Sequence, residues 1–143
     1  MIAYVDSSVI LRFALSEPGR LAEWSSIREF TTSALTEVEC LRTMDRLSLR
    51  GHLTAVEVAA SRSAVYALLE GIDVVDLDRV ILARASQPFP TPLATLDAIH
   101  LASALMCRER TGAMSLATHD VELAQAARSV GFDVLGARGA RCS

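Results

Sequence analysis

Residues 114–135 read MSLATHDVELAQAARSVGFDVL and contain one complete strand–helix–strand unit. The apolar run at 114–117 predicts a strand, and the spacing of apolar residues at 121–130 predicts a helix that ends at Gly131. Residues 132–135 then predict a second strand. A short apolar strand, a helix and another short apolar strand are typical of a parallel sheet that helices cover on both faces. This stretch therefore predicts an α/β fold.

The same alternation continues toward the N-terminus. Thr54 and Glu57 have the spacing of a capping box at the start of a helix that stops near Gly71. Pro18 suits the first turn of a helix that reaches about residue 30. Further helices are expected at 7–15, 35–50, 78–85 and 95–110, and further strands at 2–5, 31–34 and 72–75.

We therefore expect a three-layer α/β/α sandwich around a central parallel sheet of about four or five short strands. The chain has 143 residues, of which 51% are hydrophobic, and this length suits one domain with a substantial core. We expect this single domain at residues 1–135 and a flexible C-terminal tail at residues 136–143.

The basic residues exclude several phosphate-handling folds. All 14 of them are arginine, and the chain contains no lysine. A Walker P-loop needs a lysine at its phosphates, and receiver domains and haloacid-dehalogenase-type phosphatases also rely on one, so none of these can operate here in its usual form. The net charge of −3 predicts no strong bulk attraction to nucleic acid, although it leaves room for a local groove lined by arginines.

Cysteine usage and hydropathy bear on the location of the protein. Three cysteines without a CxxC spacing argue against a disulfide framework and against a structural zinc site. No apolar run approaches the roughly 20 residues of a membrane span. The opening residues, MIAYVD, lack the basic segment and long apolar run of a secretory signal. We expect a cytoplasmic protein without a membrane segment.

Two of the predicted strands are followed closely by an aspartate. Asp6 comes directly after the first strand, and Asp120 follows the strand at 114–117. The carboxyl ends of parallel strands meet at one edge of the sheet, where ligands bind in open α/β folds. Both aspartates are also suitable N-caps for the helices that follow, and the two roles are compatible. Hydroxyl groups are expected beside them at Ser7, Ser8 and Thr118.

Asp97 stands among apolar and small neighbours in the segment LATLDAIHLASALM. A charged group in such a helix is costly if it is buried without a partner. The alternative is a first-turn aspartate that the helix dipole stabilises. His100 follows at i+3 on the same face, where a lone histidine is more often a packing group than a metal ligand.

The helix at 35–50 offers two glutamates, Glu37 and Glu39. Glu39 has Arg42 at i+3, so an exposed ion pair is its simplest explanation, and the periodicity does not single it out. Arg12 and the other scattered arginines could contact phosphates, but a solvated face is the simpler interpretation.

Together these residues predict carboxylates and hydroxyls at one sheet edge. Hard oxygen ligands of this kind suit Mg²⁺ or Mn²⁺. A metal ion held there suits phosphoryl chemistry, in which it polarises a phosphate oxygen and activates water. The residues alone do not name the substrate.

Four segments resemble the PIN-domain family, and specifically the VapC-type toxins of bacterial toxin–antitoxin pairs. In family order they are IAYVDSSVIL, TTSALTEVECLR, LATLDAIHLASAL and SLATHDVELAQAA. They cover the chain from residue 1 to about 135, and LDAIHLASA is the most specific of them.

The resemblance implies a metal-dependent endoribonuclease, the toxin of a VapBC-type pair, that hydrolyses RNA phosphodiester bonds with metal-activated water. Carried over by position, the catalytic and metal-binding carboxylates are those of Asp6, Glu39, Asp97 and Asp120. Glu37 occupies the variable position, and Ser8 and Thr118 match the hydroxyl residues that support the cluster. The ion is expected to be Mg²⁺, with Mn²⁺ as the alternative, and His100 is interpreted as structural.

The resemblance also implies partners, namely an RNA substrate, a cognate VapB-type antitoxin and a second copy of the chain in a homodimer. One alternative is a PIN-fold subunit that binds RNA or protein without turnover. A weaker alternative is a metal-dependent adhesion-type binding module with the pattern D-x-S-x-S, which Asp6 and Ser8 fit but Ile10 does not.

Overall fold

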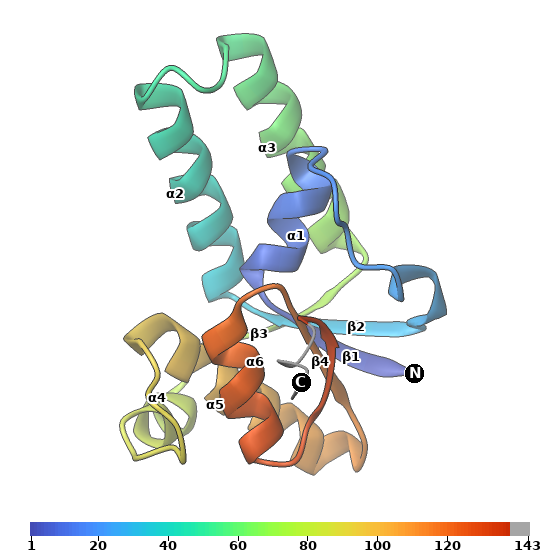
Figure 1. Ribbon diagram of the computed structural model, residues 1–143, viewed down its shortest axis with the longest axis vertical. Coiled ribbons are helices and arrows are strands. Elements are labelled where there is room, and N and C mark those ends of the chain that lie inside the picture. The colour runs from blue at the N-terminus through green and yellow to red at the C-terminus, as the bar shows by residue number, and fades with distance from the viewer. Residues whose placement is uncertain (138–143) are drawn as a thin grey trace, which may run out of the picture.

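The computed structural model describes residues 1–137 and contains one parallel sheet of five strands in the order β3-β2-β1-β4-β5. The strands are β1 (Ile2–Val5), β2 (Glu29–Ser33), β3 (Asp73–Val75), β4 (Ser115–Thr118) and β5 (Asp133–Gly136). The helices are α1 (Ser7–Ala14), η1 (Trp24–Ser26, a 3-10 turn), α2 (Leu35–Leu49), α3 (Ala55–Glu70), α4 (Arg79–Ala85), α5 (Thr95–Thr111) and α6 (Val121–Ser129). Figure 1 shows α2 and α3 as a hairpin that extends well beyond the sheet.

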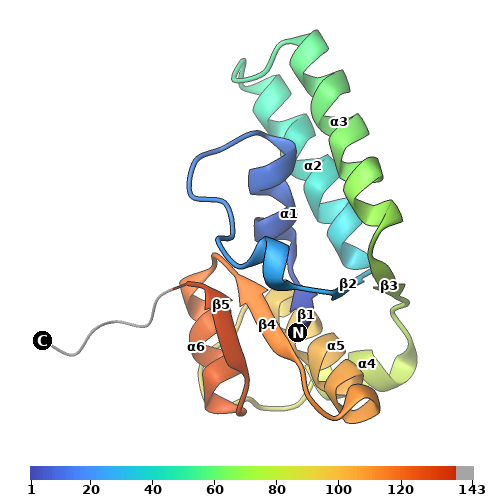
Figure 2. The ribbon, with the colours of Figure 1, turned by 90° about the vertical axis from the view of Figure 1, so that its right-hand side faces the viewer.

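The helices cover both faces of the sheet, as the sequence predicts. In Figure 2, α1, α2 and α3 lie on one side of the strands, and α4, α5 and α6 lie on the other. The central strand β1 shows why two cores form, because its residues are buried on both faces. Ala3 and Val5 belong to the core under α1, whereas Tyr4 belongs to the core with Leu101 of α5. The three-layer α/β/α sandwich and its parallel sheet are confirmed.

The prediction of a helix from residue 18 to about residue 30 is wrong. The chain turns there, with positive φ at Ser16 and Gly19, and only the single 3-10 turn η1 forms. Trp24 packs against Phe13 and Phe30 with tilted rings, at 4.4 Å and 4.3 Å between ring centroids. Tertiary packing of these rings, and the pairing of β2 with β1, override the local preference for a helix.

The last strand runs to Gly136, one residue into the segment expected to be a flexible tail. Residues 138–143 of that expected tail lie outside the described residues. No helix within residues 1–137 has the length and apolar character needed to cross a membrane.

Candidate active site

Two neighbouring strands bring Asp6 and Asp120 to the same edge of the sheet. β1 and β4 pair in parallel, with Val5 opposite Ala117, so the residues after them leave the sheet side by side. Asp6 caps α1 by accepting a hydrogen bond from the Val9 N–H at 3.3 Å, and Asp120 caps α6 by accepting one from the Leu123 N–H at 2.8 Å. Both aspartates are therefore helix caps, and the caps hold their carboxylates at the carboxyl edge of the strands.

Two hydroxyl groups hold the Asp6 carboxylate from both sides. Ser8 Oγ donates to Oδ1 and Thr118 Oγ1 donates to Oδ2, each at 2.6 Å. Asp6 is only 3% exposed, and burial raises its pKa although these hydrogen bonds and His100 act in the opposite direction. Ser8 and Thr118, which were predicted to support the acidic cluster, thus both contact Asp6 directly.

The same hydroxyls also fix the loop that carries Asp120. Ser8 Oγ accepts a hydrogen bond from the His119 N–H at 2.9 Å, and Thr118 Oγ1 accepts one from the Asp120 N–H at 3.0 Å. Asp6 and Asp120 are therefore connected through two side chains and the backbone of one turn.

Asp97 lies in the first turn of α5 and is half-buried. Burial and the negative charges of Asp120, Asp6 and Glu39 raise its pKa to about 6, while His100 lowers it. The charges of Asp120, Asp6 and Glu39 thus act on Asp97, although the four carboxylates come from separate segments of the chain. The ordinary first-turn position in the helix dipole does not account for this environment.

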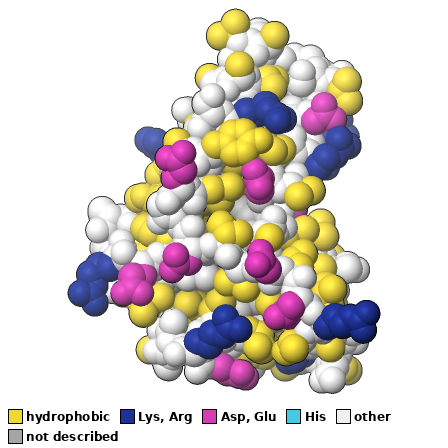
Figure 3. Space-filling view, turned by 180° about the vertical axis from the view of Figure 1, so that it is seen from behind, with side chains coloured by type: hydrophobic (Ala, Val, Ile, Leu, Met, Phe, Trp, Pro, Cys, Tyr) yellow, Lys and Arg dark blue, Asp and Glu magenta, His cyan; other side chains and the backbone are white. Residues whose placement is uncertain are grey.

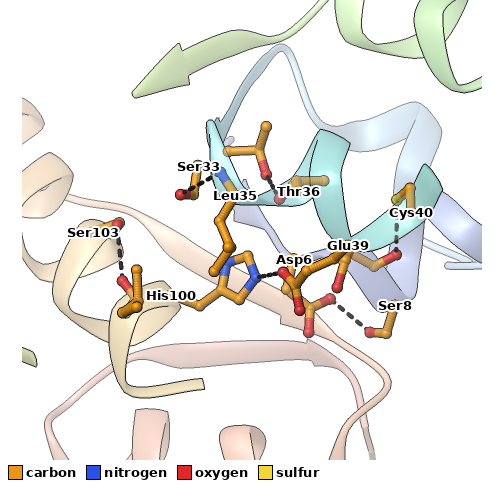
Figure 4. Close-up of polar contacts among 12 residues, drawn as sticks. Asp6, Ser8, Ser33, Leu35, Thr36, Glu39, Cys40, His100 and Ser103 are labelled. Carbon is orange, nitrogen blue, oxygen red and sulfur yellow. Dashed lines mark hydrogen bonds and ion pairs between the residues drawn. The ribbon is translucent and has the colours of Figure 1, made fainter. Parts of the chain in front are cut away.

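Glu39 is turned toward the interior by His100 rather than toward solvent. Figure 4 shows the imidazole pointing from α5 to the Glu39 carboxylate, with Asp6 beside it. His100 Nε2 lies 2.5 Å from Glu39 Oε1, and His100 Nδ1 lies 2.8 Å from the hydroxyl of Tyr4. Arg42, the expected partner of Glu39, instead pairs with Asp45 at 3.0 Å. Glu37 is exposed on the same helix.

Tyr4 and His100 form a buried chain of hydrogen bonds under the carboxylates. Tyr4 is fully buried, and burial together with the charge of Asp6 raises its pKa well above the ordinary value, so the phenol keeps its proton. Burial acts to lower the pKa of His100, but the hydrogen bond and charge of Glu39 outweigh it and raise that pKa. Sequence reasoning found His100 as a structural group but missed Tyr4, since a buried tyrosine in a strand gives no signal of its own.

The four candidate carboxylates are of the type that binds hard cations. Carboxylate oxygens are donors that hard cations prefer, and a cation near Asp97 would relieve the repulsion that it experiences from Asp120, Asp6 and Glu39. Within residues 1–137, however, no three His, Cys, Asp or Glu side chains converge as a ready set of ligands.

Five parallel strands with acidic side chains at their carboxyl edge define the class of this protein, an α/β/α sandwich with an acidic centre. The sequence pattern described as "PIN domain" matches residues 3–129. Ribonuclease VapC47 of Mycobacterium tuberculosis is 31% identical over 136 residues, which are 90% of this chain and 92% of that protein. The chain therefore belongs to the PIN-domain family, in its VapC-type group.

Two solved structures share the fold at lower sequence identity. A chain in the structure of FitAB bound to an IR36 DNA fragment aligns with a TM-score of 0.69 and 18% identity, over 94% of this chain and 93% of that one. A chain in a toxin–antitoxin complex from Klebsiella pneumoniae aligns with a TM-score of 0.58 and 16% identity, over 84% of this chain and 88% of that one. Family membership excludes the adhesion-type binding module considered from the sequence.

Proposed function

We propose that this protein is a divalent-metal-dependent endoribonuclease and the toxin of a VapBC-type toxin–antitoxin pair. One observation carries the proposal, which is that the N-caps of α1 and α6 hold two carboxylates at one sheet edge, where their charges and that of Glu39 act on Asp97 and, together with its burial, raise its pKa to about 6. The name of the relative, a ribonuclease, supports RNA as the substrate.

The carboxylates have the role of holding Mg²⁺, or alternatively Mn²⁺. The residues that hold it are Asp6, Glu39, Asp97 and Asp120. When bound, the ion supplies a Lewis acid at a phosphate oxygen and activates water for attack on phosphorus. With its pKa raised to about 6, Asp97 competes with protons for the ion below that pH, whereas the Ser8 and Thr118 hydroxyls keep the Asp6 carboxylate oriented.

One face of the described part of the molecule shows no large basic patch (Figure 3). On the face shown in Figure 3, the basic side chains stand in separate places, with Asp and Glu side chains scattered among them. The chain has no lysine and a net charge of −3, so the bound ion and a few arginines supply the positive charge that phosphates need. Substrate affinity is therefore coupled to metal binding.

The proposal includes partners and location. The structural similarity to a chain from a toxin–antitoxin complex supports a VapB-type antitoxin as partner, and the family resemblance extends this to a homodimer in the cytoplasm. An antitoxin that covers the acidic edge would suppress cleavage by excluding RNA.

The direct test is cleavage of a cellular RNA pool by the purified protein with Mg²⁺, with Mn²⁺ and with EDTA. Asp97→Asn protein, prepared in parallel, detects contaminating ribonuclease. The two glutamates of α2 give a matched pair, because Glu39→Gln alters the inward-facing carboxylate and Glu37→Gln an exposed one. We expect discrete cuts that require metal, Asp97 and Glu39 and that do not require Glu37.

Two outcomes would contradict the proposal. Equal cutting by wild type and Asp97→Asn would assign the activity to a contaminant. Metal binding without any cutting by the wild type would instead favour the alternative of a PIN-fold subunit that binds RNA or protein without turnover.

A further inference from the structure

A cavity of about 390 Å³ opens beside the acidic edge, between α1, α2 and the turn that joins β4 to α6. Its apolar wall comes from Leu11 and Leu15 on α1 and Leu47 on α2. Its polar side carries Arg12 and His119. A cavity of this size that combines an apolar wall with polar and charged groups has room for a small polar molecule.

This cavity is continuous with the candidate active site. Ser8 and Asp120 line it, and the same Ser8 donates to the Asp6 carboxylate at 2.6 Å. A group bound in the cavity therefore lies next to whatever the carboxylates hold. If the ion held by the carboxylates contacts the phosphate that is cut, the cavity is placed to receive a nucleoside attached to that phosphate.

His119 lines the cavity and carries an unused hydrogen-bonding group. Its backbone N–H donates to Ser8 Oγ at 2.9 Å, so the residue is fixed between Thr118 and Asp120. Its ring atom Nε2 is buried and has no hydrogen-bond partner among the described residues. A buried polar atom without a partner is costly in free energy, and a small rotation of the ring that lets a bound ligand pair with this nitrogen would remove that cost.

The charges in the cavity favour an uncharged occupant. Glu17 and Asp120 line it together with Arg12, so a phosphate inside it would meet two carboxylates. One N–H of the Arg12 guanidinium donates to the Gly19 carbonyl at 3.0 Å, which leaves other donors of this group for a ligand. A base and its ribose offer the matching donors and acceptors without a charge.

We propose that this cavity binds one nucleoside of a single-stranded RNA, adjacent to the phosphate that is cut, and sets the base preference at that position. The inference rests on the proposed function. The leucine wall packs against the base, and His119 and Arg12 bond to its polar edge, as side chains do with unstacked RNA bases. His119 and Arg12 are thus specificity-determining residues.

The cleavage test uses a randomised single-stranded RNA oligonucleotide whose cut sites are sequenced. The variants are His119→Ala, which removes the unpaired nitrogen, and Thr43→Trp, which fills the cavity from α2. Leu49→Trp is the matched control, since Leu49 is 81% exposed on the same helix. We expect the base preference at one position beside the cut to weaken about tenfold in His119→Ala and cleavage to fall in Thr43→Trp, with Leu49→Trp like wild type.

A binding test does not depend on turnover. The Asp97→Asn protein is titrated with adenosine, guanosine, cytidine and uridine, and the histidine ring signals are followed by NMR. We expect at least one nucleoside to shift the His119 signals while those of His52, exposed in the α2–α3 turn, stay unchanged. In a protein that carries both Asp97→Asn and Thr43→Trp, the same titration is expected to leave the His119 signals unshifted.

The outcomes separate the two proposals. An active wild type whose base preference is the same in every variant overturns the nucleoside site and leaves the nuclease intact; this is the result expected if the cavity receives a protein segment instead. An inactive wild type contradicts the nuclease, and the nucleoside titration then decides the site alone, because absence of a His119 shift overturns it.

Discussion

At the residue scale, Asp97 links the stability of the fold to pH. Its pKa is raised from its ordinary value to about 6, chiefly by burial and then by Asp120 and Asp6. The protonated carboxyl is therefore favoured in the folded state, and its contribution to stability is present in full below about pH 4. That contribution is lost as the pH rises through about 6.

We expect Asp97→Asn to stabilise the metal-free protein at pH 7, by about 1 kcal/mol after allowance for solvent screening of this half-exposed group. The asparagine is neutral at every pH, so the fall in stability between pH 4 and pH 7 should be smaller than in the wild type. Urea denaturation in EDTA at several pH values measures both effects. An identical pH dependence in the two proteins would contradict this account of Asp97.

Tyr4 tests the buried chain that holds Glu39. Tyr4→Phe removes the hydroxyl that meets His100 Nδ1 and leaves that nitrogen without its partner. We expect a loss of about 1–2 kcal/mol in the free energy of unfolding, because a buried polar atom is then unpaired. Tyr66→Phe is the control, since Tyr66 is 43% exposed, and it should leave the stability unchanged. Equal effects of the two substitutions on urea denaturation would show that the chain does not contribute.

At the element scale, β5 depends on a glycine beside Thr118. Gly136 has φ +93°, and a Cβ there would lie 2.6 Å from the Thr118 carbonyl oxygen. Gly136→Ala is expected to destabilise the protein by roughly 2 kcal/mol or more, because both the backbone conformation and the contact are strained. Gly51 has a similar φ of +75° but an open environment, so Gly51→Ala is expected to cost only about 1 kcal/mol. Thermal unfolding of both variants gives the comparison, and equal losses would argue against the close contact.

Most elements follow from local sequence patterns. The capping box of Thr54 and Glu57 forms as predicted, with hydrogen bonds of 3.0 and 3.1 Å at the start of α3. The helix predicted at residues 18–30 does not form, because apolar side chains in this segment make contacts between elements, such as the packing of Trp24 against Phe30. A local pattern does not contain the information that the neighbouring segment pairs with β1.

The candidate site was predictable to a different degree at each residue. Asp6 and Asp120 follow from their place after strands, and Asp97 from the cost of a charge in an apolar helix. Glu39 came only from the family resemblance, because its inward orientation depends on His100 of another helix, 61 residues away. His119 was not singled out, since an unpaired nitrogen exists only once the fold has buried it.

At the scale of the whole molecule, the acidic edge and the surface predict how RNA binding responds to salt. The net charge is −3, and acidic and basic side chains are mixed on the surface, as Figure 3 shows for one face. Few phosphates can then be neutralised by the protein itself. We expect the logarithm of RNA affinity to fall with the logarithm of salt concentration with a shallow slope, of about −2 to −3. Fluorescence anisotropy of Asp97→Asn protein with labelled RNA measures it, and a slope near −6 would indicate a basic surface that we have not identified.

Metal ions should stabilise the whole fold, because the repulsion among the carboxylates acts between α1, α2, α5 and α6. A cation bound by the folded protein at a concentration of 100 times its Kd adds about 2.7 kcal/mol to the free energy of unfolding. That gain corresponds to a rise in Tm of several degrees for a protein of this size. We expect Mg²⁺ or Mn²⁺ to raise the Tm at pH 7.5 and to do so less at pH 5, where Asp97, with its pKa of about 6, holds a proton that the ion must displace.

Two variants show whether the effect comes from the acidic edge. Asp97→Asn removes one of its carboxylates, whereas Asp45→Asn removes an exposed one that pairs with Arg42 on the surface of α2. The rise in Tm should be strongly reduced in Asp97→Asn and retained in Asp45→Asn. If both variants respond like the wild type, the ion binds elsewhere and the four carboxylates do not form its site. If only Asp97→Asn fails to respond, the charge that lowers the stability of the metal-free fold is also the charge that binds the ion.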